Sequence, residues 1–145
     1  MPVRIAVLAS GGGSNLQALI DRFQNDPAAP ARVELVVGSR PGIGALERAA
    51  RARIPILVLS EGLDMEGALQ ESLTSNEIDL VVLAGFLRQV PDAVVDRFRG
   101  RILNIHPALL PGFGGKGMYG MNVHRAVIAS GARVSGATVH LVDER

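Results

Sequence analysis

The chain of 145 residues has no cysteine, no marked excess of either charge and no long apolar run. The lack of cysteine excludes a disulfide framework, a thiolate zinc site and a cysteine nucleophile. A formal net charge of +1 creates no basic field for nucleic acid and no polybasic patch for a membrane surface. No apolar stretch is long enough to span a bilayer. These absences are compatible with a cytoplasmic protein that binds neither nucleic acid nor membranes.

Hydrophobic residues make up 48% of the chain and charged residues 20%, which is typical of a globular protein with a real core. Short apolar, β-branched runs alternate with longer segments whose apolar residues recur at helical spacing. The runs predict strands over Arg4–Leu8, Val33–Val37, Ile56–Leu59, Leu80–Leu83, Ile102–Ile105 and Ala137–Val142. The longer segments predict helices over Asn15–Phe23, Ile43–Arg51, Asp64–Thr74, Pro91–Phe98 and Asn122–Ser130. We therefore expect an α/β doubly wound fold, with helices on both faces of a mostly parallel sheet.

The chain shows no repeat and no linker, so residues 1–145 are expected to form a single domain. The last predicted strand ends three residues before Arg145, and a domain seldom stops so soon after a core strand. We expect this domain to be incomplete at its C-terminus. The glycine-rich stretch Pro107–Met121 is expected to be a long functional or mobile loop.

Three segments with polar or glycine-rich character follow predicted strands: Ser10–Asn15, Gly85–Arg88 and Asn104–Leu110. In open parallel sheets, ligands bind beyond the carboxyl ends of the strands, where the strand order changes direction. The three segments are therefore expected to converge on one cleft.

The turn Ser10–Asn15 contains three consecutive glycines, which let a ligand approach the backbone closely. The helix after it offers unpaired N–H groups to an anion. It is not a dinucleotide fingerprint, since Leu16 stands where a third glycine is required, and it is not a P-loop, since no Gly-Lys-Ser/Thr follows. A phosphate site at Gly13, Ser14 and Asn15 is one interpretation. A tight turn with Ser14 as the helix N-cap is the other, and this motif alone favours neither.

Asn104 and His106 lie two residues apart at the end of a predicted buried strand, so both are expected on one face of it. An amide can stabilise a developing oxyanion, and an imidazole can move a proton near neutral pH. Together they suit acyl transfer to an amine. A single histidine is more often structural. His140, in a strand near the same sheet end, could support the site from behind, but a hydrogen-bonded core histidine is the favoured interpretation. The scattered histidines predict no metal site.

Four segments, in the same order along the chain, resemble the folate-dependent formyltransferases, and among them the phosphoribosylglycinamide branch. They are Ser10-Gly-Gly-Gly-Ser-Asn-Leu-Gln17, Leu83-Ala-Gly-Phe-Leu-Arg88, Asn104-Ile-His-Pro-Ala-Leu-Leu-Pro111 and Gly136-Ala-Thr-Val-His140. The third is specific to the folate-dependent formyltransferases as a group. The Gly-Ser-Asn turn narrows the resemblance to the ribonucleotide branch, because a phosphorylated substrate needs it.

The resemblance implies a Rossmann-like fold and transfer of a formyl group from 10-formyltetrahydrofolate to glycinamide ribonucleotide in purine biosynthesis. Gly13, Ser14 and Asn15 would hold the ribose phosphate. Asn104 would orient the formyl oxygen, also contacting the folate, and His106 would donate a proton or stabilise the oxyanion as a cation. The pocket for the pterin of 10-formyltetrahydrofolate would be lined by Leu87, Arg88, Gln89 and Val90, partly through their backbone groups. No metal is implied, and the protein would be a monomer or homodimer.

Two departures from the family pattern stand out. The aspartate that pairs with the catalytic histidine is expected two positions beyond Arg145, so a chain ending there should be severely impaired or inactive. Where some members carry an arginine for the folate tail, this chain has Glu66, and no site is expected there.

Three alternatives remain open. A formyltetrahydrofolate deformylase shares the chemistry but needs no phosphate turn. A methionyl-tRNA formyltransferase typically needs a basic RNA-binding region. A phosphate-binding module without catalysis would fit a naturally short chain.

Overall fold

The computed structural model describes residues 2–106 and 138–141. Its strands are β1 Val3–Ala9, β2 Ala31–Gly38, β3 Ile56–Val58, β4 Leu80–Ala84, β5 Ile102–His106 and β6 Thr138–Leu141. Its helices are α1 Ser14–Phe23, α2 Gly44–Arg51, α3 Met65–Ser75 and α4 Asp92–Arg97. Every one of these elements was predicted from the sequence, with ends that differ by no more than two residues. The predicted helix over Asn122–Ser130 and the predicted loop over Pro107–Met121 lie outside the described residues.

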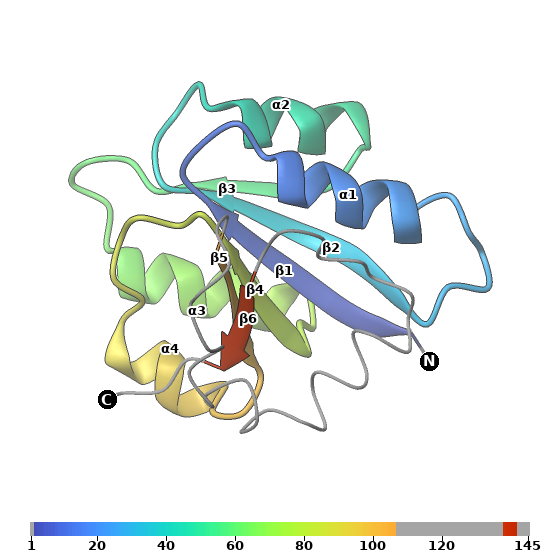
Figure 1. The fold of residues 1–145 in the computed structure, drawn as a ribbon. Helices are drawn as coiled ribbons and strands as arrows, with labels where there is room; N and C mark the ends of the chain where they lie inside the picture. Colours follow the sequence, from blue (N-terminus) through green and yellow to red (C-terminus); the bar gives the residue numbers. More distant parts are fainter. Residues whose placement is uncertain (1, 107–137, 142–145) are drawn as a thin grey trace.

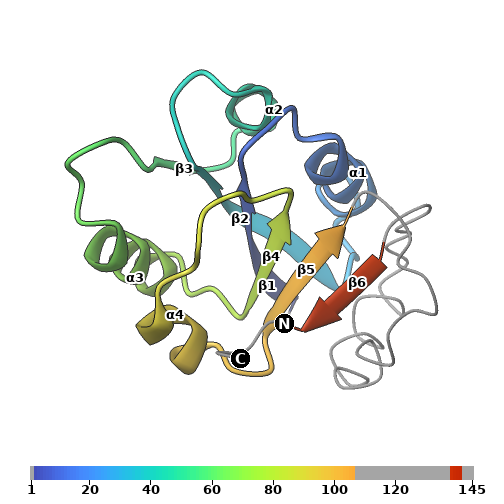
Figure 2. The same cartoon turned by 60° about the vertical axis from the view of Figure 1, so that its left-hand side comes forward.

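The strands form one sheet in the order β3-β2-β1-β4-β5-β6. The first five strands are parallel, and β6 runs antiparallel to β5. Helices α1 and α2 cover one face, and α3 and α4 cover the other, as both ribbon views show (Figures 1 and 2). The predicted doubly wound, mostly parallel fold is confirmed. The chain changes direction between β1 and β4, which makes the carboxyl ends of these strands the switch point where ligands bind in such folds.

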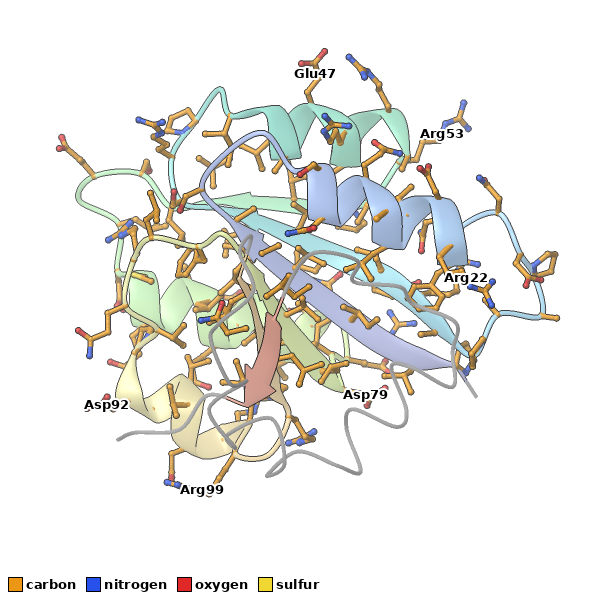
Figure 3. The ribbon with its side chains drawn as sticks, viewed as in Figure 1. Arg22, Glu47, Arg53, Asp79, Asp92 and Arg99 are labelled. Carbon is orange, nitrogen blue, oxygen red and sulfur yellow. The ribbon has the colours of Figure 1, made fainter. Side chains whose placement is uncertain are left out.

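The central strands β1 and β4 are buried on both faces over most of their length, as strands that are apolar on both sides require. In β1 and β4, alternate residues join two separate cores: Val7 and Val82 belong to the α1/α2 side, and Leu8 and Leu83 to the α3/α4 side. Charged side chains remain outside these cores. Figure 3 shows Arg22, Glu47 and Arg53 pointing outward from the α1/α2 layer.

Helix α1 begins without a side-chain cap. Its N-cap is Gly13, which has a left-handed backbone (φ 84°) and makes no side-chain hydrogen bond. Ser14 is the first helical residue, so the alternative interpretation of Ser14 as the N-cap is wrong. The reason is steric: a Cβ atom at position 13 would lie 2.8 Å from Ala45 Cα of α2. Only glycine fits against Ala45 with this backbone conformation, so position 13 is a glycine, and this glycine is the N-cap of α1.

Among the described residues, no helix has both the length and the hydropathy needed to cross a membrane.

The Gly13→Ala variant is expected to lose about 2–4 kcal/mol of unfolding free energy, because it combines a left-handed backbone with an overpacked contact. Gly42→Ala is the matched control, since Gly42 also has positive φ (77°) but nothing within 4 Å of its Cβ position. It should lose only about 1–2 kcal/mol. Urea unfolding of both variants measures the difference. Equal losses would show that the contact with Ala45 does not constrain the turn.

Candidate active site at the carboxyl edge of the sheet

The register places the ends of β1, β4 and β5 side by side. Ala9 of β1 pairs with Ala84 of β4, and Leu83 of β4 pairs with Asn104 of β5. The glycine turn, the segment after β4 and Asn104 therefore meet at one edge of the sheet. The sequence prediction that these segments converge is supported for the part of the chain that the structure describes. Residues 107–110 of the third segment lie outside it.

A hydrogen bond joins the first two segments directly. The backbone N–H of Leu87 donates to Ser10 Oγ at 2.8 Å. Ser10 is one of two buried polar residues in the described chain, and this bond satisfies its hydroxyl in a region where an unpaired polar group is costly. The bond fixes the start of the β4–α4 segment against the end of β1.

Asn104 lies on the α3/α4 side of the sheet. Its strand neighbours Leu103 and Ile105 belong to the α1/α2 core, and Ile102 belongs to the opposite core. Asn104 is half-buried, so its amide is partly shielded from water but still accessible. Across the strand pair, its backbone is opposite His140.

The backbone of His106 ends β5 and pairs with Thr138. The predicted position of its side chain on the same strand face as Asn104 stays a prediction. The side chains of His106 and His140 lie outside what the structure describes, so their proposed roles stay predictions.

The segment predicted to bind folate has two parts with different exposure. The side chains of Leu87, Arg88 and Gln89 are exposed, with Leu87 at 87%. Val90 is buried in the α3/α4 core, so any contact it makes with a ligand must come from its backbone. The Leu87 N–H is already engaged by Ser10, so this residue can offer a ligand its carbonyl and side chain only.

The glycine turn presents free backbone donors. The first α-helical bond of α1 runs from Gln17 N–H to the Gly13 carbonyl at 2.8 Å. The N–H groups of Gly12, Gly13 and Ser14 donate to no acceptor within the described residues. Such groups at a helix start form a site that favours an anion.

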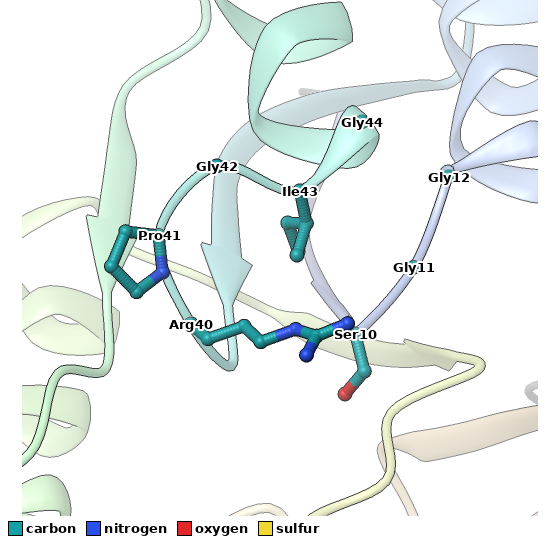
Figure 4. Close-up of a pocket in the computed structure, with 8 residues that line it drawn as sticks. All are labelled: Ser10, Gly11, Gly12, Arg40, Pro41, Gly42, Ile43 and Gly44. Carbon is teal, nitrogen blue, oxygen red and sulfur yellow. The ribbon is translucent and has the colours of Figure 1, made fainter.

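A pocket of about 350 Å³ separates the glycine turn from the loop before α2. It is lined by Ser10, Gly11, Gly12, Arg40, Pro41, Gly42, Ile43 and Gly44. Figure 4 shows the Arg40 side chain extending along it toward Ser10. Arg40 is exposed and makes no ion pair with another described residue. It therefore adds positive charge beside the turn.

Within residues 2–106 and 138–141, no three acidic, histidine or cysteine residues lie close enough to hold a metal ion. The predicted absence of a metal site stays a prediction.

Three residues of this edge had no role in the sequence interpretation. Ser10 was inside the glycine-turn motif, but its partner lies 77 positions away. Arg40 and Arg48 approach the turn from the neighbouring βα unit and belong to no motif. The sequence offered one signal only, that ligands bind near the ends of the strands. That signal indicates a region of the sheet and does not single out any of these three side chains.

Comparison with known proteins identifies the family of the chain. Residues 3–145 match the family model described as formyl transferase. The chain belongs to the formyl transferase family. The resemblance found in its motifs is confirmed, and it covers the three segments that meet at the carboxyl edge of the sheet.

Several relatives are similar over almost the whole chain. Phosphoribosylglycinamide formyltransferase, chloroplastic, of Arabidopsis thaliana is 44% identical over 97% of this chain and 50% of its own length. The trifunctional purine biosynthetic protein adenosine-3 of Homo sapiens is 40% identical over 97% of this chain and 14% of its own length. The crystal structure of glycinamide ribonucleotide transformylase 1 from Geobacillus kaustophilus has a TM-score of 0.76 at 39% identity, covering 100% of this chain and 77% of that one. The chain thus spans half the length or less of these curated relatives, from 50% of the Arabidopsis protein to 14% of the human one.

The Ser10→Ala variant should leave the Leu87 N–H without its acceptor and loosen the segment after β4. Amide hydrogen exchange at Leu87 should accelerate by about tenfold, corresponding to the loss of roughly 1.4 kcal/mol of protection. Ser39→Ala is the matched control. Ser39 is also buried, but it binds through its backbone N–H, which donates to the Ala9 carbonyl at 2.9 Å. Unchanged exchange at Leu87 in Ser10→Ala would contradict the tethering role.

Proposed function

We propose that the protein transfers the formyl group of 10-formyltetrahydrofolate to the amine of glycinamide ribonucleotide, a step of purine biosynthesis. One observation carries the proposal. The register of β1, β4 and β5 sets a turn with free N–H donors, an exposed loop and the half-buried Asn104 at one sheet edge. The similarity to phosphoribosylglycinamide formyltransferases over nearly the whole chain supports the same reaction.

Each substrate has its own part of this edge in the proposal. The ribose phosphate lies at Gly13, Ser14 and Asn15, where the uncapped start of α1 provides donors and the positive end of the helix dipole. The folate lies along the segment after β4. Its proposed contacts are Leu87, Arg88, Gln89, Val90 and Asn104.

The chemistry requires few groups. The amine nitrogen attacks the formyl carbon and forms a tetrahedral oxyanion, and the bond from that carbon to the folate nitrogen then breaks. Asn104 donates to the oxyanion, a role for which a partly buried, preorganised amide is suited. His106 supplies the proton that the departing folate nitrogen takes up, or stabilises the oxyanion as a cation. In the net reaction, one proton leaves the attacking amine and one is gained by the folate nitrogen, so tetrahydrofolate leaves with no net change in protons and no metal is needed.

The competing functions are weakened by different observations. A deformylase or a methionyl-tRNA formyltransferase does not account for a phosphate turn. Two of the relatives named above are a phosphoribosylglycinamide formyltransferase and a glycinamide ribonucleotide transformylase. A binding module without catalysis differs from the enzyme only in turnover. A cytoplasmic location and a monomeric or dimeric state stay predictions.

Mixing the full-length protein with 10-formyltetrahydrofolate, with and without glycinamide ribonucleotide, separates these functions. We expect tetrahydrofolate to be released only when the ribonucleotide is present. Release without the ribonucleotide would indicate a deformylase, and no release in either mixture would leave a binding module. Either of these results would overturn the proposal.

The Asn104→Ala and His106→Ala variants should each lower kcat by about 10²- to 10³-fold, because each removes a group that acts on the transition state. The dissociation constant for the ribonucleotide should stay within about twofold of wild type. Asn25→Ala, an exposed asparagine away from the edge, is the control and should be fully active. Near-normal turnover in either site variant would refute its assigned role.

A further inference from the structure

The glycine turn rests on α2 through two of its carbonyl groups. The Gly11 carbonyl accepts from Ala45 N–H at 3.1 Å, and the Gly12 carbonyl accepts from Arg48 Nε at 2.7 Å. Arg48 also donates from Nη1 to Gln17 Oε1 of α1 at 3.3 Å. Its guanidinium thus connects α2, the glycine turn and α1.

These contacts determine where the N–H groups of the turn point. The described peptide bonds are all trans, and in a trans peptide the N–H is directed opposite to the carbonyl of the same plane. Since the carbonyls of Gly11 and Gly12 face α2, the N–H groups of Gly12 and Gly13 face away from it. The carbonyl oxygens, which would repel an anion, are held on the far side of the turn from these donors.

Only one of the two contacts is a side-chain contact. Ala45 donates through its backbone, which any residue there could supply, whereas the bond to Gly12 depends on the Arg48 guanidinium. A charged donor makes a stronger hydrogen bond than a neutral one. Arg48 is half-buried and close to the turn: its Cδ lies 3.1 Å from where a Cβ of Gly13 would be.

We propose that Arg48 is a positioning residue for phosphate recognition, in that it holds the Gly12 carbonyl against α2 and so directs the N–H groups of the turn to the substrate phosphate. This inference rests on the formyltransferase function proposed above. Arg48 acts through the backbone of the turn. Its replacement should therefore weaken binding of the ribonucleotide phosphate and leave binding of the folate substrate unchanged.

The test compares glycinamide ribonucleotide with the same molecule without its phosphate, both titrated calorimetrically into the full-length protein. Arg48→Met keeps the aliphatic stem and removes the donors. It should weaken ribonucleotide binding by about tenfold, while binding of the phosphate-free compound and the KM for 10-formyltetrahydrofolate stay unchanged. Arg48→Lys keeps the charge but places all its donors on a single nitrogen, which cannot reach both Gly12 and Gln17, so its loss of affinity should be intermediate.

Arg51→Met is the matched control. Arg51 lies on the same helix and pairs only with the exposed Glu47 among the described residues. Arg51→Met therefore removes the same positive charge from α2 without changing a contact of the glycine turn. If Arg48→Met binds the ribonucleotide as well as Arg51→Met does, the proposal is wrong. It is also wrong if both compounds weaken equally, since that would indicate a general loss of structure.

Two further results keep the outcomes separate. If Arg48→Met does not fold, Arg48→Lys decides: weaker ribonucleotide binding with an unchanged phosphate-free compound supports the proposal, and wild-type binding overturns it. If the wild-type protein itself does not prefer the ribonucleotide, the proposed function fails, and the inference fails with it.

Discussion

The position of β1 between β2 and β4 is the constraint on which the rest of the structure depends. Residues Ile5–Ala9 are buried, so this strand has no accessible face, and only its carboxyl end can reach a ligand. The helices change sides of the sheet at this strand. The turn that leaves β1 must therefore enter α1 on one side, while the segment that leaves β4 must enter α4 on the other. The opening between these two diverging connections is where the polar groups gather.

Two contacts hold the connections that leave β1 and β4 in place. Ser10 ties the β4 segment to the end of β1, and α2 supports the glycine turn from behind through Ala45 and Arg48. The Ser10–Leu87 bond is partly buried, where hydrogen bonding is worth more than at an exposed surface. The Arg48–Gly12 bond is exposed, but its donor is charged, which strengthens it. The edge thus combines free N–H donors with a turn whose Gly11 and Gly12 carbonyls are hydrogen-bonded to α2.

Much of this architecture could be predicted from the sequence. Strands such as Leu80–Ala84, which are apolar on both faces, indicate a doubly covered parallel sheet whatever the order of its strands. The polar residues that follow strands indicate the edge at which ligands bind. Prediction failed where the outcome depended on contacts between distant segments. Ser14 has the side chain of an N-cap, yet the approach of Ala45 to position 13 makes glycine the cap. The contacts of Ser10 and Arg48 have no local pattern, because their partners lie 77 and 36 positions away.

Leu87 gives the two halves of the edge different thermodynamic character. Its side chain is 87% exposed, while its N–H is bound to Ser10. A ligand that covers the β4 segment removes apolar surface from water, and such burial carries a negative heat-capacity change. A ligand held only by the N–H groups of the glycine turn replaces water at polar donors and lacks that contribution. The temperature dependence of the binding enthalpy therefore distinguishes the two parts of the same sheet edge.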